Sequence, residues 1–63
     1  MDEVFYTVVV YDNIRDRIDY EYPIVYATLA EAKTFKDSHG EDDEFSLEIA
    51  EYNIDKLTIK YVG

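Results

Sequence analysis

The sequence predicts an α+β domain: a four-stranded antiparallel sheet with one short helix packed on one face, in the chain order β-β-α-β-β. Three observations lead to this prediction. Residues 3–11 are almost all β-branched or aromatic, three other segments alternate apolar with polar residues, and residues 29–38 have helical spacing behind a capping signal. The chain has 63 residues, so we expect a single domain, residues 1–63.

Both faces of the first predicted strand, residues 3–11, are apolar. A strand of this kind is usually covered on both sides, which places it in the interior of a sheet. Val8 points to one face, and Phe5, Val9 and Tyr11 point to the other. If the helix covers the Val8 face, the other three residues are left on an uncovered face, where together they would form a patch for self-association.

The second predicted strand, residues 17–22, alternates cleanly and is expected to be half-buried. Its apolar side holds Ile18, Tyr20 and Tyr22. A polar loop near residues 12–16 joins it to the first strand, so the two form a β-hairpin. Pro23 has no amide hydrogen to donate, so the strand ends there or lies at an edge of the sheet.

The helix is predicted over residues 29–38. Thr28 and Glu31 have the spacing of a capping box, in which the threonine hydroxyl accepts from the amide three residues on and the glutamate reaches back. Apolar residues then recur at helical spacing and give the helix one face for the sheet: Leu29, Ala32 and Phe35.

Two further strands are predicted after the helix. In residues 45–50, Phe45, Leu47 and Ile49 alternate with polar or small residues. The alternation breaks at residues 52–55, which are predicted to hold the turn. The last strand then alternates almost to the C-terminus through Leu57, Ile59 and Tyr61. No repeat, linker or low-complexity tract is apparent along the chain.

The chain is strongly acidic, with 15 acidic and 6 basic residues and a formal net charge of −9. Such a surface repels phosphate backbones and anionic membranes, so we expect no direct binding to nucleic acid or to a membrane. Basic protein partners are favoured instead, and the same charge also serves solubility. No apolar run approaches the roughly 18 residues of a membrane span, and the acidic N-terminus differs from a signal peptide, so we expect a cytoplasmic protein.

Residues that could carry catalysis are few. There is no cysteine, which excludes a thiol nucleophile and thiolate metal ligands. The only histidine, His39, is adjacent in sequence to Ser38, which gives no triad geometry, and two glycines cannot build a phosphate-binding loop. His39 with the acids of residues 41–43 lacks the ligand pattern of a calcium loop. The sequence therefore predicts no enzyme, no metal and no cofactor.

Residues 37–51 are the most distinctive region, because they contain seven acids and no lysine or arginine. We expect the loop acids to project from the end of the helix and Glu48 to lie on the polar face of the third strand, which together would make a ribbon of negative potential. The alternative is a solvated loop that continues into a solvated strand face. The predicted partner-binding residues are these acids and one tyrosine anchor: Asp37, Glu41, Asp42, Asp43, Glu44, Glu48, Glu51 and Tyr52.

In size, acidity and lack of catalytic groups, the chain resembles the small inhibitor and adaptor proteins that phages and mobile elements carry. This resemblance is one of composition. It implies a non-enzymatic protein-binding module that engages a basic, nucleic-acid-binding protein, in one version by imitating nucleic acid. The alternative is a structural or self-associating protein that forms a homodimer through a sheet face, with the charge serving solubility only.

Overall fold

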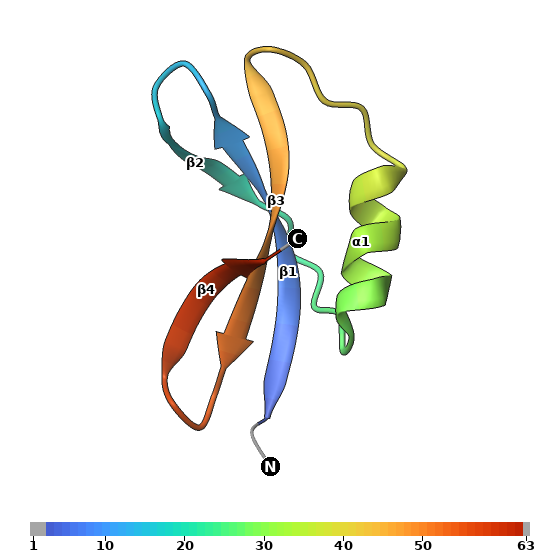
Figure 1. Cartoon of the computed structure of the whole chain (residues 1–63), viewed down its shortest axis with the longest axis vertical. Coiled ribbons are helices and arrows are strands. Elements are labelled where there is room, and N and C mark those ends of the chain that lie inside the picture. Colours follow the sequence, from blue (N-terminus) through green and yellow to red (C-terminus); the bar gives the residue numbers. More distant parts are fainter. Residues whose placement is uncertain (1–2, 63) are drawn as a thin grey trace.

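The computed structural model describes residues 3–62 and has the predicted α+β fold (Figure 1). A first hairpin of β1 (Val4–Asp12) and β2 (Arg17–Glu21) is followed by α1 (Leu29–Asp37) and by a second hairpin of β3 (Phe45–Asn53) and β4 (Thr58–Val62). The sheet is antiparallel throughout, in the order β2-β1-β3-β4. The prediction that residues 3–11 lie in the sheet interior is confirmed, because β1 lies between β2 and β3.

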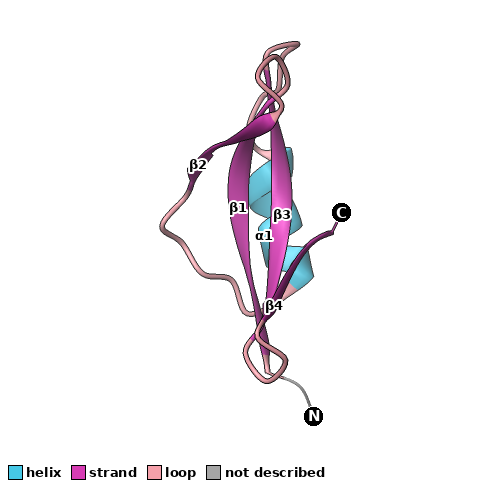
Figure 2. Cartoon of the chain, turned by 90° about the vertical axis from the view of Figure 1, so that its left-hand side faces the viewer, coloured by secondary structure: helices cyan, strands magenta, loops and turns pink. Residues whose placement is uncertain are grey.

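The helix covers one face of the two central strands, and Figure 2 looks onto the other face with α1 behind it. The core lies between α1 and these strands and consists of Val8, Ala32, Leu47 and Ile49. Aromatic rings extend it toward β2, where Tyr22 meets Phe35 edge to face at 5.0 Å between ring centroids. Among residues 3–62, no helix has the length and apolar character that crossing a membrane requires.

Thr28 begins the helix, as predicted. Its hydroxyl oxygen accepts a hydrogen bond from the Glu31 amide at 3.3 Å. The glutamate also reaches back, but its carboxylate accepts from the Thr28 hydroxyl at 3.0 Å instead of from the backbone amide. The capping box is therefore confirmed in its position, with the two side chains bonded to each other.

The two hairpins are structurally equivalent, a repeat that was not apparent in the sequence. Each residue of the first hairpin corresponds to the residue 41 positions later in the second, since β1 and β3 begin at Val4 and Phe45 and β2 and β4 begin at Arg17 and Thr58. Val8 pairs directly with Ile49, and Ile49 is also the residue that corresponds to Val8 under this offset. A pseudo-two-fold axis therefore passes between Val8 and Ile49, perpendicular to the sheet.

The hydrogen bonds that begin the two turns repeat as well. Asp12 Oδ1 accepts from the amide of Arg15 at 2.9 Å, and Asn53 Oδ1 accepts from the amide of Lys56 at 2.9 Å. Aspartate and asparagine are favoured at this position because their side-chain oxygens bond the backbone a few residues on. The aspartate also forms an ion pair with Arg15 at 2.8 Å, which Asn53 cannot reproduce with Lys56.

The second turn lies at residues 54–57, so the prediction that it lies at residues 52–55 is wrong. β3 continues to Asn53, because this residue starts the turn just as Asp12 does. Leu57 was predicted to lie on the last strand, but it is the fourth turn residue, 88% exposed, with a left-handed φ of 53°. Its counterpart Asp16 has a φ of 56°.

β2 departs from the symmetry at one residue. Its register with β1 shifts at Asp19, which forms a β-bulge, whereas the register of β4 with β3 is continuous. The bulge turns Tyr20 to the helix side and leaves Ile18 on the other side, so the prediction that they share one face is wrong. Tyr61, the counterpart of Tyr20, keeps its side chain on the face away from α1.

Candidate functional site

The face of the sheet opposite α1 is covered by no other element among residues 3–62. Figure 1 shows β2 and β4 both bending to the side away from α1, so that this face lies between them. We call it the open face. Strand register places these residues on it: Phe5, Thr7, Val9, Tyr11, Ile18, Glu21, Ser46, Glu48, Ala50, Tyr52, Ile59 and Tyr61.

A hydrogen-bonded network covers the centre of the open face. The ring of Tyr52 stacks on Phe5, with centroids 4.8 Å apart and 5° between the planes. Its hydroxyl donates to Glu21 Oε2 at 2.5 Å, and the Thr7 hydroxyl donates to the same oxygen at 2.7 Å. The bond to Glu21, followed by burial, raises the pKa of Tyr52 above its ordinary value. Tyr52 was predicted to anchor a partner, but its ring and hydroxyl are engaged within the chain.

The predicted self-association patch lies on the open face, but little of it is exposed. Val9 is only 3% exposed, and Phe5 and Tyr11 are half-buried. Val9 is flanked by Glu21 of β2 and Glu48 of β3 in the sheet register. The prediction of Val9 as an accessible contact is therefore wrong.

The exposed apolar groups of this face come from the edge strands. Ile18 is 39% exposed, Ile59 is 57% exposed and Tyr61 is 56% exposed. Sequence reasoning did not identify these residues as a surface. Alternation shows that Ile59 and Tyr61 share a face but does not say which face meets the helix.

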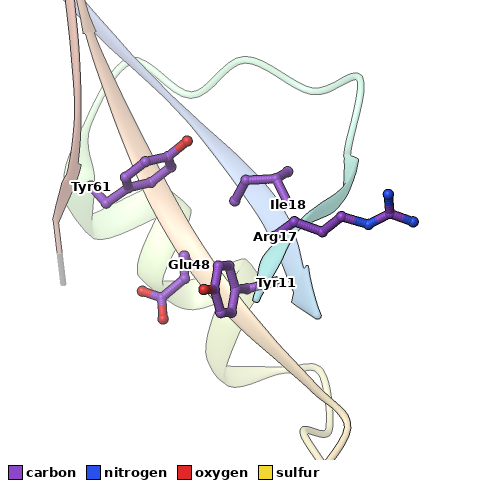
Figure 3. A pocket seen from close by; sticks show the side chains of 5 residues that line it. All are labelled: Tyr11, Arg17, Ile18, Glu48 and Tyr61. Atoms are coloured by element: carbon purple, nitrogen blue, oxygen red, sulfur yellow. The ribbon is translucent and has the colours of Figure 1, made fainter. Parts of the chain in front are cut away.

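Two hollows lie on the open face. The first hollow, about 330 Å³, is lined by Tyr11, Arg17, Ile18, Glu48 and Tyr61 (Figure 3). The second hollow, about 290 Å³, lies at the other hairpin, and its lining includes Phe5, Tyr52, Leu57 and Ile59. Tyr11 and Ile18 in the first correspond to Tyr52 and Ile59 in the second under the 41-residue offset. The hollows are thus products of the same hairpin geometry.

The seven acids of residues 37–51 are divided among three places, so the predicted single ribbon is wrong. Asp37 and the four loop acids lie at the end of α1 and beyond it, and all are exposed. Glu48 lies on the open face among aromatic and apolar side chains, not on a polar strand face. Glu51 lies on the helix face, because strand residues three positions apart point to opposite sides.

Glu51 is engaged on that side of the sheet. Its Oε1 accepts from the Tyr6 hydroxyl at 3.0 Å, and its Oε2 lies 3.3 Å from Lys60 Nζ. The hydrogen bond to Glu51 is the largest cause that raises the pKa of Tyr6 above its ordinary value. Glu51 therefore holds β1, β3 and β4 together, which removes it from the candidate partner-binding residues.

One of the loop acids shapes the backbone. Asp42 Oδ1 accepts from the amides of Glu44 and Phe45 at 2.9 and 2.8 Å. The loop also has a counter-charge nearby, because the pKa of Arg15 is raised first by Asp12 and additionally by Glu44. The exposed loop acids Glu41 and Asp43 carry no such role within residues 3–62.

Within residues 3–62, no group of three or more histidine and acidic side chains is placed to hold a metal ion. His39 packs on the helix, with its ring 4.2 Å from that of Phe35 and its Nδ1 3.0 Å from the Phe35 carbonyl oxygen. Comparison of the chain with protein-family models, with curated proteins and with solved structures finds no match.

Proposed function

We propose that the chain is a non-enzymatic protein-binding module whose open face docks onto a basic protein. The observation that carries the proposal is the combination of exposed Ile18, Ile59 and Tyr61 with the carboxylate of Glu48 on one face. Interface centres are enriched in aromatic residues, and apolar side chains gathered on one face favour contact with another protein. A module of this kind acts by blocking or bridging its partner, as an inhibitor or adaptor does.

Charge favours a basic partner over a second copy of the chain. Each copy carries a formal net charge of −9, so two copies repel each other, whereas a basic protein is attracted from a distance. A homodimer through this face would also bring Glu21 and Glu48 of both copies together. The molecule is 38 Å long and 23 Å wide, so one face is large enough for an interface of about 800 Å² per partner.

The separation of the acids among three places favours docking by a sheet face over imitation of a nucleic-acid backbone. Imitation requires a row of carboxylates at regular spacing on one surface. In the proposed complex, the loop acids at residues 41–44 lie at one end of the molecule, where they steer the approach of the partner and add little to affinity.

The proposal is tested by capturing partners from a lysate of the source organism with immobilised chain and then measuring the purified pair. Ile59→Ser with Tyr61→Ser alters the open face, and Ile24→Ser with Val25→Ser is the matched control, since these two are exposed in the segment before α1. We expect a basic protein whose binding is lost in the first variant, is kept in the second and weakens with salt. A partner that depends on the control pair, or one insensitive to salt, would overturn the proposal.

A further inference from the structure

Glu48 is one of the residues that line the first hollow. On the open face of β3 it lies between Ser46, which pairs with Tyr11, and Ala50, which pairs with Tyr61. The two tyrosines therefore lie on either side of Glu48 along the sheet. Figure 3 shows both rings and the Glu48 carboxylate together on this side of the sheet.

Glu48 is the half-buried carboxylate of the sheet that lacks a partner. Glu21 accepts two hydroxyl hydrogen bonds, and Glu51 accepts one and pairs with Lys60. Within residues 3–62, the side chain of Glu48 makes no hydrogen bond and no ion pair. Its carboxylate oxygens therefore remain available as acceptors for a cation that enters the hollow.

From this arrangement, and on the basis of the proposed function, we propose that the first hollow binds an arginine side chain of the partner. Tyrosine rings attract cations through their faces, and a carboxylate accepts from a guanidinium through two parallel hydrogen bonds. Arginine satisfies both contacts at once, because its planar guanidinium stacks on rings while it donates in its own plane. Ile18 supplies an apolar wall for the methylene groups of the arginine stem.

Arg17 also lines the hollow, and its charge makes the expected change in affinity different for a cation and for an anion. Its guanidinium points away from Glu48 in Figure 3, and no ion pair joins the two side chains. Its positive charge at the rim therefore opposes an incoming cation. Removal of that charge should strengthen the binding of an arginine, whereas it would weaken the binding of an anion.

The second hollow is an internal control. It repeats the Tyr-and-Ile geometry of the first, but none of the side chains that line it is charged. The position that corresponds to Glu48 is Thr7, which is buried under the Glu21 carboxylate. A ligand that recognises only rings and apolar surface should bind both hollows, and a ligand that needs the carboxylate should bind the first alone.

The test uses the full chain and a capped peptide, Gly-Ser-Arg-Ser-Gly, with citrulline in place of arginine as the uncharged isostere. Amide chemical shifts are followed by NMR during titration at constant ionic strength. We expect the arginine peptide to perturb Tyr11, Glu48 and Tyr61 and the citrulline peptide to bind at least about threefold more weakly. Glu48→Gln should lower the affinity for the arginine peptide by about fivefold, and Arg17→Gln should raise that affinity by about twofold.

Asp43→Asn removes the same charge from the loop and should leave the affinity within about twofold, which separates the hollow from overall charge. If Glu48→Gln does not fold, Tyr61→Leu is used in its place. Loss of the Tyr61 ring should lower the affinity for the arginine peptide by about threefold. Equal binding of both peptides, unchanged binding in Glu48→Gln, or weaker binding in Arg17→Gln would overturn the inference. In that case, a basic partner captured through the open face would still support the proposed function. Conversely, arginine binding in the first hollow without any such partner would support the arginine site but not the proposed function.

Discussion

The hydroxyl of Tyr52 donates to the carboxylate of Glu21 at 2.5 Å, and this bond connects β3 to β2 across the intervening β1. The bond connects the edge strand β2 to the central strand β3, although these two strands are not neighbours in the sheet. It also lies on the open face, where Tyr52 lines the second hollow. The contact therefore contributes both to the stability of the sheet and to the shape of the surface that it offers to a partner.

Removing only the Tyr52 hydroxyl should weaken the fold. Tyr52→Phe keeps the stacking on Phe5 and should lower the free energy of unfolding by about 1 kcal/mol, measured by urea denaturation. Tyr61→Phe is the control, because the Tyr61 hydroxyl makes no hydrogen bond within residues 3–62. The folded pKa of Tyr52 is raised, so the contribution is present below the ordinary tyrosine pKa of about 10 and is lost as pH rises through the folded value. A stability difference that stays constant in strong alkali would contradict the assignment.

Truncation at the pseudo-two-fold axis should be severe. Ile49 and Val8 are both 0% exposed. Ile49→Ala should cost about 3 to 4 kcal/mol and Ile49→Val about 1 kcal/mol, because the α1–sheet contact leaves little room to relax. Thermal unfolding followed by circular dichroism measures both. Ile54→Ala, at a side chain 46% exposed, should stay within about 0.5 kcal/mol, and an equal cost at both sites would show that the core lies elsewhere.

The left-handed backbone of Leu57 should be open to improvement. Leu57→Gly should raise the free energy of unfolding by about 1 kcal/mol, because the Cβ atom of leucine is strained at a φ of 53° and the side chain is 88% exposed. Asp16→Gly should gain less, since aspartate tolerates the left-handed region better. Chemical denaturation of the two variants gives the comparison. A loss of stability in Leu57→Gly would mean that leucine contacts in the second hollow outweigh the backbone strain.

Asp12 should make the fold sensitive to acid. The amide of Arg15, followed by its guanidinium, lowers the pKa of Asp12 below the ordinary value of about 3.9. Its contribution is therefore present above that value and is lost as pH falls through the folded pKa. Asp12→Asn reproduces the side chain of Asn53, so it should keep the turn, lose the ion pair and flatten the dependence of Tm on pH. Asp12→Ala should melt lower still, and a pH profile unchanged in Asp12→Asn would refute this role.

The oligomeric state separates the proposed function from self-association. Sedimentation equilibrium should show a monomer at the highest accessible concentration. If a dimer forms through the open face, Ile59→Asp should dissociate it without unfolding, because Ile59 is 57% exposed. Val9→Asp cannot serve as this test, since Val9 is 3% exposed and a charge there should unfold the chain.

The fold could be predicted because its signals are local. The two-sided apolar pattern of residues 3–11 placed β1 in the sheet interior, and Thr28 with Glu31 marked the start of α1. The offset of 41 residues also has a signal, since Tyr11, Asp12 and Ile18 recur as Tyr52, Asn53 and Ile59. The match is too sparse to stand out, because the intervening positions diverge. The offset of 41 residues, applied to the first turn, would have placed the second turn correctly at residues 54–57.

The candidate site was harder to predict because it depends on long-range geometry. The bulge at Asp19 sends Ile18 and Tyr20 to opposite faces, and only the packing of Tyr22, which follows β2, against Phe35 of α1 requires it. Likewise, seven acids that are close in sequence suggested one surface, but the strand sends Glu48 and Glu51 to opposite sides. Acidic residues that are close in sequence need not share one surface, because successive side chains of a strand point to opposite faces of the sheet.

The contact between Val8 and Ile49 also has a consequence for the order of folding. Each hairpin closes through a four-residue turn and can form within about 1 to 10 μs. Pairing β1 with β3 must instead close a long loop, whose entropy cost rises with its length. The nine residues of α1 lie inside that loop, so helix formation reduces the number of flexible residues that the closure has to order. We therefore expect refolding in two kinetic steps, fast formation of the two hairpins and slower pairing of β1 with β3, and a helix that forms early should reduce the entropy cost of the second step.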